Sequence, residues 1–136
     1  MRTVLFLFIL SLLSCTGSKK ATHSGIDSVQ FGSGGGFTGL STIYLLGSDG
    51  KLMQTDESMG RKNIVLIKTI DKEKVALFFE KANALKEYTY NSPDNMYSFI
   101  EMRFGEKTNK IVWGFDKTKV DSRAVTLYNE LMELIK

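Results

Sequence analysis

The chain of 136 residues has a single cysteine, Cys15, and a single histidine, His23. One cysteine cannot form a disulfide within the chain, and one cysteine with one histidine cannot supply the ligand set of a usual zinc site. A histidine-activated nucleophile would have to use His23, which lies in a short polar segment outside any periodic pattern. The composition therefore predicts a domain held together by packing alone, with no metal, no cofactor and no histidine-based catalysis.

The apolar run at residues 4–13 is too short to cross a bilayer, which takes roughly 20 apolar residues. It follows Arg2 and leads into Ser14 and Cys15. A basic N-terminal region, a short apolar region and a small residue before the cleavage site are typical of a signal peptide. The Ala-x-Ala-like site of an ordinary secretory signal does not occur near Cys15.

The tetrapeptide Leu12-Leu13-Ser14-Cys15 resembles the lipobox of bacterial lipoproteins. Leu12 and Ser14 match the pattern, whereas Leu13 is larger than the residue usually found at that position. The resemblance implies that residues 1–14 are a signal peptide, removed just before Cys15. It also implies that Cys15 carries a diacylglycerol thioether and an N-acyl chain such as palmitate, which would hold the protein on a membrane.

Residues 15–24 are expected to be the lipidated cysteine followed by a flexible tether. The tether is expected because these residues are polar and lack hydrophobic periodicity. In lipoproteins an Asp directly after the cysteine can mark retention in the inner membrane, and Thr16 stands there instead. The resemblance therefore implies a cell-envelope protein on the outer membrane, facing the periplasm. Residues 25–136 remain for a single domain.

The net charge of the chain is only +3, and it falls to +2 when Arg2 leaves with the signal peptide. So small a charge does not indicate a nucleic-acid partner. Scattered acidic residues include Glu101, which we expect to form a surface ion pair with Arg103 on the same side of a strand.

Alternating or β-branched segments predict strands at residues 26–32, 40–46, 51–55, 63–70, 96–104 and 110–115. The apolar content of residues 63–70 predicts a well-buried strand. Helices are predicted over residues 72–87 and from Asp121 onwards, with Asp71 and Asp121 as N-caps. The expected fold class is α+β: one mainly antiparallel sheet of about six strands, two helices on one face, in the order ββββαββα. The other face, with Tyr97 and Phe99, would be partly open.

The glycine cluster at residues 32–39 is the unusual feature of the domain. Residues 34–39 match G-x-G-x-x-G, but a strand pattern follows where a dinucleotide site needs a helix. Two interpretations remain: a structural excursion that requires glycine, or a loop that binds an anion or a partner. The candidate loop residues are Gly34, Gly35, Gly36, Phe37, Thr38 and Gly39. Of these, Phe37 is expected to pack into the core.

The sequence thus favours a non-catalytic, lipid-anchored envelope protein that binds a protein or another envelope component. One alternative is a small-ligand or anion-binding module built on the glycine cluster. Another is a hydrolase that uses carboxylates alone. A closed glycine segment with a flat apolar patch would favour the first function, and an open cleft beside that segment would favour the second.

Overall fold

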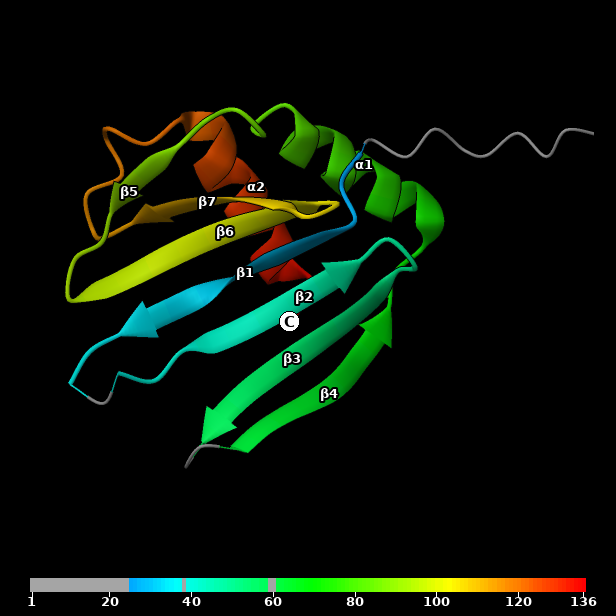
Figure 1. Cartoon of the computed structure of the whole chain (residues 1–136), viewed down its shortest axis with the longest axis horizontal. Helices are drawn as coiled ribbons and strands as arrows, with labels where there is room; N and C mark the ends of the chain where they lie inside the picture. Colours follow the sequence, from blue (N-terminus) through cyan, green and yellow to red (C-terminus); the bar gives the residue numbers. More distant parts are fainter. Residues whose placement is uncertain (1–24, 38, 59–60) are drawn as a thin grey trace, which may run out of the picture.

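The computed structural model describes residues 25–37, 39–58 and 61–136, which form one sheet and two helices (Figure 1). The helices are α1 (Lys72–Asn83) and α2 (Ser122–Glu133). The strands are β1 (Ser28–Gly35), β2 (Thr42–Gly47), β3 (Lys51–Ser58), β4 (Arg61–Thr69), β5 (Tyr90–Ser92), β6 (Met96–Phe104) and β7 (Lys107–Trp113). The predicted α+β class, with one sheet and two helices, is confirmed.

The sheet has seven strands in the order β4-β3-β2-β1-β6-β7-β5, so the prediction of about six strands is wrong. The additional strand is β5, which pairs parallel with β7, whereas every other pairing is antiparallel. Each helix follows a run of strands, which gives ββββαβββα instead of ββββαββα. A strand of three residues is too short for its alternation to be seen in the sequence.

One face of the sheet packs against both helices. Side chains alternate between the two faces of a strand, so every second residue of the central strands enters this core. The buried core side chains of β1, β6 and β7 are Val29, Phe31, Ile100, Met102, Ile111 and Trp113. Trp113 packs edge-on against Tyr128 of α2, with ring centroids 5.2 Å apart. The face opposite the helices is called the open face below.

Both helices begin where the sequence predicts them, but α1 ends at Asn83 and not at residue 87. In α1 the buried residues follow helical spacing, and they are Val75, Phe78, Phe79 and Ala82. Asp121 caps α2, and its side chain accepts a hydrogen bond from the Arg123 backbone N–H. Asp71 occupies the N-cap of α1 but makes no side-chain cap bond. In the described part of the chain, no helix has the length and apolarity needed to cross a membrane.

Strand β4 contradicts the prediction of a well-buried strand at residues 63–70. It lies at the edge of the sheet, and Ile64, Val65 and Leu66 are 60%, 59% and 54% exposed. The helices cover the centre of the sheet, while much of β3 and β4 extends away from them (Figure 1). An apolar composition predicts burial, but the position of a strand within a sheet depends on distant pairings that composition does not contain.

Candidate functional site

The glycine cluster lies partly within β1 and partly in the turn after it. Gly34 and Gly35 belong to β1, which continues past Gly32, where the sequence predicted its end. Gly36 and Gly39 flank the turn, with φ angles of 78° and 63°. Two of the predicted site residues, Thr38 and the lipidation residue Cys15, lie outside the described residues.

The glycines within β1 allow close approach of the neighbouring strand β6. A Cβ on Gly34 would lie 2.6 Å from the Tyr97 hydroxyl oxygen, because the Tyr97 side chain covers this position. A Cβ on Gly35 would collide with the backbone oxygen of Asn95. These contacts support the structural interpretation of both glycines, since the space that a side chain would take is already filled.

The turn after β1 uses its own backbone groups. The Gly36 N–H donates to the Asn95 carbonyl at 2.7 Å, and the Gly39 N–H donates to the Gly36 carbonyl at 3.1 Å. Because an anion-binding nest needs free N–H groups, these two donors do not serve one. The prediction that Phe37 packs into the core is wrong: its side chain is fully exposed, because β1 has already run beyond its last core residue, Phe31.

A shallow hollow of about 280 Å³ lies beside this end of the sheet. It is lined by Ser33, Met96, Tyr97, Ser98, Gly114, Phe115 and Lys117. Lys117 is the one cationic residue of this lining, and Phe115 is almost fully exposed. The hollow therefore has little of the convergent polar chemistry that fixes a small ligand.

Replacing Gly35 by Ala tests whether the cluster is structural. We expect the free energy of unfolding to fall by about 3 kcal/mol, because strain at φ 96° adds to the collision with Asn95. Gly39→Ala is the matched control, since it shares the positive φ but would meet no atom within 4 Å. It should cost only about 1 kcal/mol. Equal losses in urea titrations of the two variants would show that the close approach contributes nothing.

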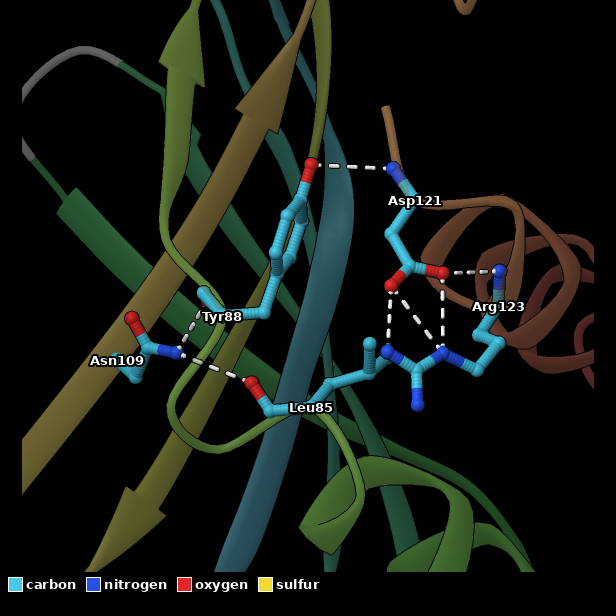
Figure 2. A network of polar contacts seen from close by, with 5 residues as sticks. All are labelled: Leu85, Tyr88, Asn109, Asp121 and Arg123. Atoms are coloured by element: carbon cyan, nitrogen blue, oxygen red, sulfur yellow. Dashed lines mark hydrogen bonds and ion pairs between the residues drawn. The ribbon is translucent and has the colours of Figure 1, made fainter. Parts of the chain in front are cut away.

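A buried polar network ties the chain after α1 to β7 (Figure 2). The Asn109 side-chain amide donates to three backbone carbonyls, those of Leu85 at 3.4 Å, Lys86 at 3.0 Å and Tyr88 at 2.8 Å. The Leu85 carbonyl also accepts a hydrogen bond from the Tyr88 backbone N–H at 2.9 Å, so the two shorter bonds of Asn109, to the carbonyls of Lys86 and Tyr88, use the two hydrogens of its NH₂ group. Its position beside a polar hollow of about 500 Å³ suggests ligand contact, but its NH₂ group is already used by the chain itself.

The same network continues to the start of α2. The Tyr88 hydroxyl accepts a hydrogen bond from the Asp121 backbone N–H at 3.0 Å. The Asp121 carboxylate in turn pairs with Arg123 at 2.6 Å. Hydrogen bonds from the Arg123 side chain and backbone lower the pKa of Asp121, so its carboxylate stays charged at neutral pH. The network joins the segment after α1 to β7 and to the start of α2.

Two carboxylates of the open face and its rim, those of Asp94 and Glu101, contact groups of the chain itself. Asp94 accepts a hydrogen bond from the Phe115 backbone N–H at 2.7 Å. Glu101 pairs with Lys110 at 3.7 Å and not with Arg103, because β7 places Lys110 directly beside it. Within the ranges that the structure describes, no three His, Cys, Asp or Glu side chains converge as metal ligands would.

The most exposed apolar surface of the sheet lies on β4. We define the β4 edge patch as Ile64, Val65, Leu66 and Ile67, all of them exposed. Alternation along the strand turns Ile64 and Leu66 to the open face and Val65 to the opposite face. Contiguous exposed apolar residues are a common feature of interaction surfaces.

On the open face, apolar side chains continue from the β4 edge patch towards the centre of the sheet. Leu66 is in register with Met53 of β3, and Met53 is in register with Leu45 of β2. Farther across the face, Phe99 is buried, with the Lys110 ammonium 4.5 Å from its ring centroid. The predicted aromatic side chains on the open face are thus partly covered, and the accessible apolar area lies towards β4.

Sequence reasoning missed the β4 edge patch because it assigned these residues to the core. A usable signal was present: the apolar run is flanked by Lys62 and Lys68, and lysines are frequent on edge strands. No protein-family model and no curated protein matches the chain.

Proposed function

We propose that this chain is a lipid-anchored protein of the cell envelope that acts by binding another protein and has no turnover of its own. The lipobox-like residues ending at Cys15 support the anchor, and their context supports the outer membrane, facing the periplasm. The β4 edge patch carries the binding proposal, since exposed Ile64, Val65 and Leu66 form an apolar edge without any covering element among the described residues.

The small-ligand alternative has less support. The N–H groups of Gly36 and Gly39 bond to the chain's own carbonyls, and the neighbouring hollow has one cation, Lys117. A carboxylate hydrolase would need an acid whose pKa is raised towards neutrality. The pKa shifts of Asp49, Asp116 and Asp121 are all downward, caused by hydrogen bonds from neighbouring groups.

Photo-cross-linking in intact cells tests the binding proposal. A photoreactive amino acid at Leu66 should give a discrete heavier species that contains this chain and a second polypeptide. The matched control is the same amino acid at Leu77, an apolar residue of α1 that is 50% exposed, where no such species is expected. Equal yields at the two positions, or turnover in a hydrolase screen that disappears when one carboxylate is removed, would contradict the proposal.

A further inference from the structure

The two edges of the sheet differ in how open they are to another strand. The β5 edge has three residues and is followed by Pro93, which cannot donate to a ladder. The β4 edge has nine residues without proline, and among the described residues only β3 pairs with it. An edge strand of this length presents a row of backbone N–H and C=O groups to which an extended segment can pair.

The charge of β4 restricts what can pair there. Residues 61–69 contain three basic side chains and no acidic one. Exposed Lys62 and Lys68 stand at either end of the β4 edge patch. Lys62 is in register with Glu57 of β3, whereas Lys68 is in register with Leu52. Opposite charges directly across a strand pair are favourable and like charges are unfavourable, so β4 favours a partner strand with carboxylates at both ends and apolar residues between them.

A second copy of this chain does not meet that requirement. Antiparallel pairing of two β4 strands centred on Val65 would bring Lys62 of each copy level with Lys68 of the other and supply no carboxylate to either, although the register shift beside Leu52 and Met53 turns Lys68 to the helix-covered face and Lys62 to the open face. Centring the pair on Ile64 instead would place Lys62 opposite Leu66. This register avoids bringing two lysines together, but it sets a charged side chain against an apolar one. The lysines therefore act against self-pairing, a usual role of charge on edge strands.

We propose that β4 binds, by strand addition, an extended segment of a partner protein with a central apolar stretch and Asp or Glu near each end. The backbone of β4 supplies the hydrogen bonds. Ile64 and Leu66 contact the apolar side chains of the segment on the open face, and Lys62 and Lys68 pair with its carboxylates. This inference rests on the proposed binding function and specifies its partner.

Two isotope-labelled peptides of nine residues, the length of β4, provide the test with the full chain held in lipid nanodiscs. Both have alternating Val and Thr in the centre; one ends in glutamates on both sides and the other in lysines. We expect the glutamate peptide to bind about tenfold more tightly at low salt. Its isotope-edited infrared band should shift to the strand position on binding, which side-chain contact alone would not cause.

Charge reversal supplies the matched variants. Lys62→Glu combined with Lys68→Glu should invert the preference, so that the lysine peptide binds more tightly. Lys72→Glu combined with Lys74→Glu makes the same charge change on exposed positions of α1 and should leave the preference unchanged.

Inversion by the β4 variant alone, with the strand band, supports the inference. Equal affinities of the two peptides, inversion by both double variants, or binding without the strand band overturns it. Dimerisation of the chain that Leu66→Lys abolishes, with neither peptide bound, also overturns it and assigns the edge to a second copy. If the inference fails while the Leu66 cross-link persists in cells, the proposed function stands; if that cross-link is absent as well, both fail.

Discussion

Cys15→Ser is expected to move the protein almost completely from the membrane fraction to the soluble fraction, or to leave it uncut with residues 1–14 attached. Each buried methylene of an acyl chain contributes roughly 0.8 kcal/mol, so an anchor of several chains holds essentially all of the protein on the membrane. No other cysteine can take over this role, because Cys15 is the single cysteine of the chain.

Fractionation and intact mass measure this effect directly. The matched control is Ser14→Ala, which keeps a small residue before Cys15 and should leave both the lipid mass and the membrane fraction unchanged. A wild-type protein that is already soluble and carries no lipid mass would contradict the anchor.

The second large effect concerns Asn109. Asn109→Ala is expected to lower the free energy of unfolding by about 2–3 kcal/mol, because it leaves the carbonyls of Leu85, Lys86 and Tyr88 without this donor. Urea unfolding followed by the fluorescence of Trp113, the single and fully buried tryptophan, measures the loss.

The control for this experiment is Asn91→Ala. Asn91 lies exposed on β5, and its replacement should change stability by less than about 0.5 kcal/mol. If both variants unfold at the same urea concentration, Asn109 does not hold the segment after α1 to β7. A selective loss at Asn109 would show that its amide is committed to the fold and is not free for a ligand.

Much of the fold follows from local patterns in the sequence. Alternation identifies β1 and β6, and the spacing of Val75, Phe78 and Phe79 identifies α1, because these patterns reflect which side of each element is buried. The N-cap position of Asp121 is also correct, since its short side chain can accept a hydrogen bond from the first turn of α2.

The errors arise where a position depends on residues far away in the sequence. The sequence predicts a loop at Gly34, because nothing local indicates that Tyr97 of β6 covers it. The sequence predicts that residues 64–67 are buried, because their composition does not show that β4 is the edge strand of the sheet. Four apolar residues in a row make β4 easy to recognise as a strand. The same four residues predict burial, and so the sequence does not reveal the β4 edge patch.

In β4 the apolar composition predicts burial, whereas the position at the edge of the sheet leaves the side chains exposed. Sequences usually place their local preferences in agreement with the fold, and exceptions concentrate at functional sites. An apolar strand that stays exposed among the described residues costs solubility, and lysines at both ends offset that cost. Pairing of β4 with a partner would bury Ile64 and Leu66 and remove the disagreement.

Amide hydrogen exchange of β4 tests the central claim most directly, by comparing the protein in native envelopes with the purified full chain. A bound partner strand would occupy the outer backbone groups of β4, so these amides should exchange at least about tenfold more slowly in the envelope. Amides of β5 serve as the internal reference and should exchange equally in both states. Identical exchange across β4 in the envelope and in the purified chain would contradict the account.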